Sequence, residues 1–251
     1  MSFESYKTLF DRDGFVIVRR LLAPPEFDEL RAQLDRYIRD VVPALPDSDA
    51  FFDDRSRPET LKQMQNLNSH DPFFADYMRN PTWIALAEAL LCEPAGSQGV
   101  EWFNKPPGGR HETPPHQDNY YFNLKPPNVS TLWMAIDRVD RENGCLRYVQ
   151  GSQRGGLRPH APSTVLGFSQ RITDYGPEDR LREVEIHLEP GDVVAHHAEI
   201  IHRADANVSP TRNRRAVAMV FRGASSGRDE EGYARYREAL REQHLRKGLR
   251  P

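Results

Sequence analysis

The stretch Pro114-Pro115-His116-Gln117-Asp118 decides which fold and which chemistry this chain can support. Its two prolines exclude a helix and favour an extended chain, because proline lacks an N–H donor and restricts the residue before it. On an extended strand, residues i and i+2 point to the same side. We therefore expect His116 and Asp118 to present an imidazole and a carboxylate together, close enough to share a metal ion. A His-x-Asp pair alone also occurs by chance.

A third ligand has to come from further along the chain, and the segment 195–202 offers three histidines. The last of them, His202, follows an apolar pair. With His116 and Asp118 it would complete a set of two histidines and one carboxylate, which leaves neighbouring coordination positions open and is typical of non-haem Fe(II) oxygenases. Spacing alone leaves two interpretations of His202 equally open, a metal ligand and an ordinary buried histidine.

Short strands separated by Pro/Gly turns surround these residues, whereas helices are confined to the flanks. Apolar periodicity and charge pattern predict helices over 4–13, 25–42, 81–91 and 230–246. Strands are predicted over 14–22, 130–138, 145–149, 184–188, 193–195 and 214–222. No strand–helix alternation of the kind that a parallel sheet needs is present. The pattern predicts a mainly β protein with a sandwich or jelly-roll core and flanking helices.

Composition excludes several classes of protein. The chain has 251 residues, of which 38% are hydrophobic and 28% charged, so it can bury a core. A net charge of -3 gives no reason to expect nucleic acid or an anionic membrane as a partner. No apolar run is long enough to cross a membrane, and we expect no signal peptide. Two cysteines without a C-x-x-C spacing exclude a disulfide framework and a cysteine-rich zinc site, and they indicate a reducing, cytoplasmic compartment.

Eight motifs occur in a fixed order along the chain. They are Asn104-Lys105-Pro106-Pro107, His116-Gln117-Asp118, Trp133-Met134-Ala135-Ile136, Asn143-Gly144-Cys145-Leu146, Gly151-Ser152, Glu189-Pro190-Gly191-Asp192, Ile200-Ile201-His202 and Arg214-Arg215-Ala216-Val217. In this order they resemble the phytanoyl-CoA dioxygenase family of Fe(II)- and 2-oxoglutarate-dependent dioxygenases. The resemblance covers most of residues 13–223.

The resemblance implies a double-stranded β-helix, the jelly-roll or cupin-like fold. We expect one domain over 1–251, with a core at about 99–223 and helical flanks at 1–98 and 229–251. Iron would be held by His116, Asp118 and His202. The implied cofactors are Fe(II), 2-oxoglutarate and O2, and no catalytic side chain is implied beyond the iron site.

The resemblance also assigns residues to the co-substrate. Arg214 would bind the far carboxylate of 2-oxoglutarate, since a guanidinium matches a carboxylate through two hydrogen bonds and stays charged. Gln117, Lys105 and Trp133 match family positions that line the same pocket. Trp133 could equally be a core aromatic residue, and Lys105 a solvated strand end. This chain departs from the family at Ala204, where a small hydroxyl residue is usual, and in a longer loop before Arg214.

Strand alternation supports the choice of Arg214 over its neighbour Arg215. On the predicted strand, Arg214, Ala216, Ala218 and Val220 share one face, and Arg215, Val217, Met219 and Phe221 share the other. The small residues at 216 and 218 leave room beside a bound acid, whereas the larger apolar ones suit packing against an outer layer. We therefore expect Arg214 to enter the barrel.

The substrate is the least defined part of the prediction. Tyr120, Tyr121 and His111 lie near the iron motif in the sequence, and we expect them to contact the substrate. A small or medium-sized polar metabolite is favoured, such as a natural product or an antibiotic sugar. Arginine supplies most of the basic residues, which fits a bacterial gene. Three alternatives stay open: an acyl-CoA or acyl-carrier hydroxylase of the same family, a metal-dependent cupin-like enzyme without 2-oxoglutarate, and a non-catalytic jelly-roll binding protein. The oligomeric state is not predicted.

Overall fold

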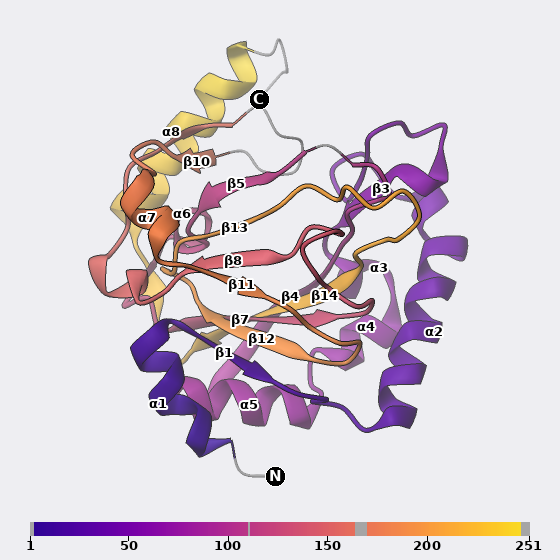
Figure 1. Cartoon of the computed structure of the whole chain (residues 1–251), viewed down its shortest axis with the longest axis horizontal. Coiled ribbons are helices and arrows are strands. Elements are labelled where there is room, and N and C mark those ends of the chain that lie inside the picture. The colour runs from indigo at the N-terminus through magenta and orange to yellow at the C-terminus, as the bar shows by residue number, and fades with distance from the viewer. Residues whose placement is uncertain (1–2, 110, 164–169, 247–251) are drawn as a thin grey trace.

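Two antiparallel sheets face each other in this computed structural model, which describes residues 3–109, 111–163 and 170–246 (Figure 1). The larger sheet has seven strands in the order β1 (Phe15–Val18), β12 (Val193–His197), β7 (Val129–Ala135), β14 (Ala216–Gly223), β4 (Ala95–Phe103), β3 (Leu61–Met64) and β2 (Ala50–Phe52). The smaller sheet has the order β11 (Glu183–Ile186), β8 (Leu146–Val149), β13 (His202–Ala204) and β5 (Thr113–His116). The predicted mainly β, jelly-roll fold with flanking helices is confirmed.

Minor elements complete the chain. Two further strand pairs are β9 (His160–Pro162) with β10 (Gln170–Ile172) and β6 (Leu124–Lys125) with β15 (Gly227–Arg228). Short helices are α3 (Leu67–His70), α4 (Pro72–Tyr77), α6 (Asn119–Phe122) and α7 (Pro177–Leu181), with 3-10 turns η1 (Val42–Ala44), η2 (Pro58–Thr60) and η3 (Ser152–Gly155). Among the described helices, none is long and apolar enough to cross a membrane.

The four predicted helices form close to their expected bounds, as α1 (Glu4–Asp13), α2 (Pro24–Asp40), α5 (Pro81–Leu91) and α8 (Glu230–Arg246). Helix α1 stops where Gly14 takes a left-handed conformation with φ of 84°. Helix α2 starts at a proline pair that fits the first helical turn. Helix α5 is capped by Asn80, whose side chain accepts a hydrogen bond from the Thr82 N–H.

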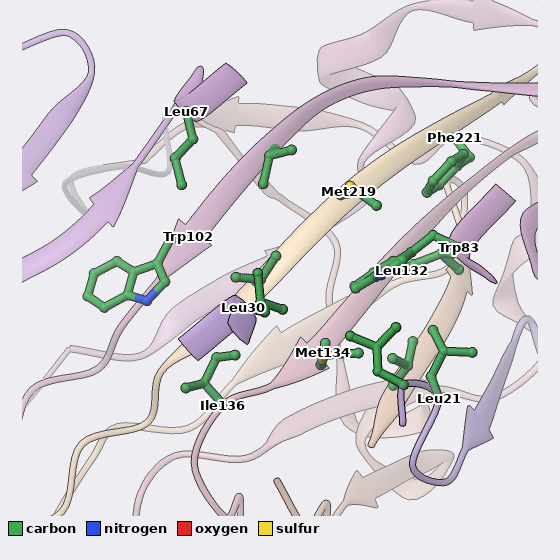
Figure 2. Close-up of a cluster of buried hydrophobic side chains, with 14 of the residues drawn as sticks. Leu21, Leu30, Leu67, Trp83, Trp102, Leu132, Met134, Ile136, Met219 and Phe221 are labelled. Carbon is green, nitrogen blue, oxygen red and sulfur yellow. The ribbon is translucent and has the colours of Figure 1, made fainter. Parts of the chain in front are cut away.

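The main hydrophobic core lies between α1, α2 and α5 and the outer face of the larger sheet. Figure 2 shows Leu30 and Trp83, from α2 and α5, packed with Leu132, Met134 and Met219 from the central strands. All of these side chains are fully buried. The inner face of the same strands looks toward the smaller sheet and encloses the cavity described below.

The predicted boundary of the β core needs a correction. Strands β1, β2 and β3 all precede residue 99 and still belong to the larger sheet, so the segment 1–98 is not only a helical flank. Strand β3 is held by its pairing with β4, in which Gln63 lies opposite Phe103. Its short sequence, Leu61 to Met64, has no clear apolar alternation, so the sequence did not predict it. The strand forms because its neighbour β4 pairs with it.

Candidate metal centre and its cavity

Three side chains from distant parts of the chain converge between the two sheets. His116 ends β5 and lies opposite His202, the first residue of β13. Oδ1 of Asp118 lies 3.7 Å from Nε2 of His116 and 3.6 Å from Nε2 of His202. One ligand atom from each residue lies within 4.8 Å of the others, a spacing that one metal ion can bridge. The structure thus brings together the three residues predicted as metal ligands.

Hydrogen bonds aim each of these side chains at the common point. Nδ1 of His116 donates to the Pro114 carbonyl at 2.8 Å, and Nδ1 of His202 donates to the Ile200 carbonyl at 3.1 Å. With Nδ1 engaged in this way, Nε2 presents its lone pair to the centre. A backbone carbonyl is one of the common partners of a metal-binding histidine.

The Asp118 carboxylate is fixed through its other oxygen. Oδ2 accepts a hydrogen bond from Thr131 Oγ1 at 2.8 Å and lies 3.1 Å from His196 Nε2. His196 is itself held by the Tyr148 hydroxyl, 2.8 Å from its Nδ1. His196 is therefore a support for Asp118, and its ring does not belong to the group of three that could hold the ion.

The protonation states suit a metal. Burial lowers the pKa of His116 and of His202, so both imidazoles are neutral at neutral pH. Burial raises the pKa of Asp118, but His202, His196 and His116 lower it by more, and the net pKa lies well below the ordinary value. A metal ion needs this combination of neutral imidazoles and an ionised carboxylate.

The local geometry of the His-x-Asp motif differs from the prediction. Strand β5 ends at His116, and Asp118 has helical angles, φ of -60° and ψ of -36°, at the start of α6. A strand-to-helix turn, rather than the i, i+2 alternation of a strand, brings the carboxylate beside the imidazole. The turn is fixed by Asn119, whose N–H donates to the Ala198 carbonyl at 2.8 Å.

A cavity of about 310 Å³ opens beside the three side chains. Its wall includes Trp133 and Arg214 as well as polar groups that were not predicted, among them Gln63 and Glu101. Pockets of this size hold small molecules. The signal for Glu101 was present in the sequence as a single charge within the otherwise apolar run 100–103.

Arg214 is a buried cation with no salt-bridge partner among the described residues. Its side chain is 4% exposed, its guanidinium carbon lies 5.2 Å from the centre of the Trp133 ring, and Nε has no hydrogen-bond partner among the described residues. Burial lowers its pKa to about 10, so the group stays charged at neutral pH. Arg215 faces the other way and pairs with Asp137 at 2.8 Å. The arrangement suits an acidic ligand that approaches Arg214 from the cavity.

Gln117 does not reach the cavity. Its amide donates to the carbonyls of Gly156 and Glu199, both at 2.8 Å, and accepts from the Arg158 N–H at 2.8 Å. All the hydrogen bonds of this fully buried side chain go to backbone groups, because it points away from the side on which His116 lies. The structure gives Gln117 a role in anchoring loops instead of the predicted contact with the co-substrate.

Lys105 is buried, and its ammonium donates to the His111 carbonyl at 2.9 Å. Burial and then the charge of Arg214 hold its pKa well below the ordinary value. Lys105 and the exposed His111 line a smaller hollow of about 50 Å³, which shares Arg214 with the main cavity. The two predicted tyrosines lie in different surroundings. Tyr121 lines the main cavity, whereas Tyr120 stacks on His160 with ring centres 4.1 Å apart.

A second group with metal-like spacing, Cys145, Glu185 and His187, does not resemble a metal site in its chemistry. Burial raises the pKa of the Cys145 thiol to about 11, which makes the thiolate that a metal needs more costly to form. Glu185 is already paired with Arg141 and Arg147, at 2.5 and 2.7 Å.

Comparison with known proteins agrees with this geometry. The sequence model of the phytanoyl-CoA dioxygenase family matches residues 10–216. Mouse peroxisomal phytanoyl-CoA dioxygenase is 26% identical over 253 residues, covering 91% of this chain and 72% of the mouse protein. The phytanoyl-CoA dioxygenase of Arabidopsis thaliana is 30% identical over 178 residues, covering 68% and 61% of the two chains.

Solved structures share the fold. The epimerase SnoN, in complex with Fe3+, α-ketoglutarate and nogalamycin RO, superposes with a TM-score of 0.71 at 22% identity, over 93% of this chain and 88% of SnoN. EctD from S. alaskensis, with 2-oxoglutarate and 5-hydroxyectoine, gives 0.71 at 16% identity, over 88% and 76%. AviO1 from Streptomyces viridochromogenes gives 0.69 at 25% identity, over 89% and 96%. On its sequence match, its fold and its converging histidines and aspartate, this chain belongs to the phytanoyl-CoA dioxygenase family and is an Fe(II)- and 2-oxoglutarate-dependent dioxygenase that uses O2.

Proposed function

We propose that this enzyme oxidises a C–H bond of a small or medium-sized polar metabolite, with Fe(II) held by His116, Asp118 and His202. The observation that carries the proposal is the convergence of two neutral imidazoles and one ionised carboxylate on a single point at the wall of a cavity. This donor set fits Fe(II), and it leaves coordination positions open on the cavity side. We further propose that residues 1–251 act as one catalytic domain.

The bound iron, with 2-oxoglutarate and O2, supplies the oxidising power for hydroxylation or a related C–H oxidation. The protein's own residues bind and orient. Thr131 and His196 hold the Asp118 carboxylate in place. Arg214 would fix the far carboxylate of 2-oxoglutarate, since it is charged, buried and without an anionic partner among the described side chains. Trp133 lies against that guanidinium and would pack beside the same ligand.

A polar substrate is supported by the cavity wall and by two of the fold relatives. Gln63, Gln65 and Glu101 place two amides and a carboxylate in the cavity. A hydrocarbon chain at these groups would leave them desolvated without partners. SnoN was solved with nogalamycin RO and EctD with 5-hydroxyectoine, neither of which is an acyl-CoA. A role in tailoring a bacterial natural product fits these observations.

An acyl-CoA substrate is the second candidate, because the curated relatives with 25–30% identity are phytanoyl-CoA dioxygenases. Gln63 and Glu101 in the cavity wall argue against it, since an acyl chain lying against them would leave an amide and a carboxylate without partners.

The test has two stages. Anaerobic addition of Fe(II) and 2-oxoglutarate to the purified protein should produce a visible charge-transfer band, and a folded protein without such a band would overturn the proposed iron site. A panel of polar metabolites and acyl-CoAs is then scored for faster succinate formation. We expect the polar compounds to stimulate it. Stimulation by acyl-CoAs alone would favour the second candidate.

A further inference from the structure

Glu101 is a carboxylate in the cavity wall for which the proposed iron and co-substrate sites have no use. It lies on β4, where Val100 and Trp102 face the helices and Glu101 faces inward. Its partner across the sheet is Ala218 on β14, whose small side chain leaves the carboxylate open to the cavity. The backbone therefore holds Glu101 rigidly, with its head group directed at whatever fills the cavity.

Other buried carboxylates of this protein have cations beside them. Glu183, 6% exposed, pairs with Arg203 at 2.5 Å, and Asp192, 2% exposed, pairs with Arg19 at 2.6 Å. For Glu101 the influences are burial, the negative charge of Asp118 and the side-chain amide of Gln63, and no cation of the described residues is among them. Burial, and then Asp118, raise its pKa to about 7. A buried carboxylate without a cation is costly unless something else binds it.

The loaded site does not supply the missing partner. In the proposed arrangement the two charges of Fe(II) and that of Arg214 offset the two carboxylates of 2-oxoglutarate and that of Asp118. Among the described residues of the wall the other cation is Arg203, which pairs with Glu183 and Asp205. With the Gln63 amide as its donor among the described residues, the Glu101 carboxylate can still accept further hydrogen bonds after iron and co-substrate have bound.

We propose that Glu101 selects the substrate of this oxygenase by accepting a hydrogen bond from a hydroxyl or protonated amino group, with Gln63 beside it. The inference rests on the proposed function, because it takes the cavity next to the three metal ligands as the substrate site. A substrate that lacks such a donor would leave the part-buried Glu101 with Gln63 alone as its partner among the described residues, and polar pockets of this kind discriminate strongly against analogues without the matching group.

The experiment uses three ring compounds of similar size and different charge as probes: cyclohexylammonium, cyclohexanol and cyclohexanecarboxylate. Each is titrated anaerobically into the full-length protein loaded with Fe(II) and 2-oxoglutarate, and binding is followed as a shift of the visible band. We expect cyclohexylammonium or cyclohexanol to bind about tenfold or more tightly than cyclohexanecarboxylate, the ratio expected for one hydrogen bond to a charged group. In Glu101→Leu that preference should disappear.

A second variant separates the two donor groups. Glu101→Gln keeps an acceptor for a hydroxyl but cannot offset a cation, so tighter binding of cyclohexanol alone points to hydroxylated substrates. If neither cyclohexylammonium nor cyclohexanol binds Glu101→Gln more tightly than cyclohexanecarboxylate does, the result points to amines as substrates. Glu199→Gln is the matched control, since Glu199 is part-buried with a raised pKa but binds Asn119 outside the cavity wall, and it should keep the wild-type ranking. Thermal unfolding followed by circular dichroism checks that each variant is folded.

The inference is overturned if wild type binds the carboxylate probe as tightly as the others, if no probe binds, or if Glu101→Leu keeps the wild-type ranking. These failures are distinct from failure of the proposed function, in which no visible band forms with Fe(II) and 2-oxoglutarate in the wild-type protein.

Discussion

The inner and outer faces of the larger sheet are built from alternate residues of the same strands, yet they have opposite character. On β14 the outer face carries Val217, Met219 and Phe221, all fully buried against the helices. The inner face carries Ala216 and Ala218, and Arg214 lies just before them in the cavity wall. Strands β7 and β4 repeat this division. Packing on one face fixes the backbone, and that rigidity lets the other face keep polar groups that would be costly elsewhere.

The largest effect should come from the cavity side, where function can be removed without loss of the fold. His202→Ala removes one of three proposed protein ligands, so we expect loss of nearly all bound Fe(II) and of all 2-oxoglutarate turnover, measured as iron content and succinate formation. The thermal unfolding midpoint of the iron-free protein should change little, because the outer core is intact.

His197→Ala is the control for this change. His197 lies in the same histidine-rich segment, but its ring packs near Phe10, outside the group of three. We expect it to retain iron. Full iron content and normal turnover in His202→Ala would show that the distal ligand is another residue.

The outer face should give the reverse result. Leu132 is fully buried in the core between β7 and the helices (Figure 2). Leu132→Ala leaves a cavity there and should lower the free energy of unfolding by about 2–5 kcal/mol, measured by urea denaturation. The folded fraction should keep the wild-type requirement for 2-oxoglutarate. A marked rise in that requirement would mean that the two faces are coupled and that the division drawn above is too sharp.

Arg214 and Arg215 test the division within two adjacent residues. Arg214→Ala should raise the 2-oxoglutarate concentration needed for half-maximal succinate formation by about 30-fold or more, since a charge-assisted contact with a buried carboxylate contributes about 2 kcal/mol or more. Iron should be retained. Arg215→Ala, which breaks a pair with Asp137 on the other side of the sheet, should change this requirement little. The opposite ranking would reverse the assignment of inner and outer face on this strand.

Sequence alternation was sufficient to predict the two faces of β14, because the strand is long and central and its small and large residues alternate cleanly. The ordered family motifs were sufficient to predict which residues converge at the metal centre. The position of Asp118 in a strand-to-helix turn was not predictable, since a proline pair excludes a helix only before His116. The hydrogen bonds from the Gln117 side chain to backbone groups and the pairing of β3 with β4 both depend on partners distant in the chain. Local sequence patterns do not predict such contacts.

The smallest effect tests the two faces with a pair of neighbouring hydroxyl groups on β7. Thr131 points inward and donates to Asp118 at 2.8 Å, whereas Ser130 points outward, is fully buried and has no hydrogen-bond partner among the described residues. Thr131→Val keeps the shape and removes the hydrogen bond, so the Asp118 carboxylate loses one of the two groups that orient it. Loss of such a support costs about tenfold or more in metal affinity, and we expect Fe(II) to bind Thr131→Val about tenfold more weakly in an anaerobic titration.

Ser130→Ala removes a hydroxyl that bonds to nothing in the described structure, so Fe(II) affinity should be unchanged and stability equal or higher. Equal Fe(II) affinity in Thr131→Val and wild type would mean that the carboxylate is held by His196 and the metal alone, and the inner face would then owe its geometry to fewer contacts than the structure indicates.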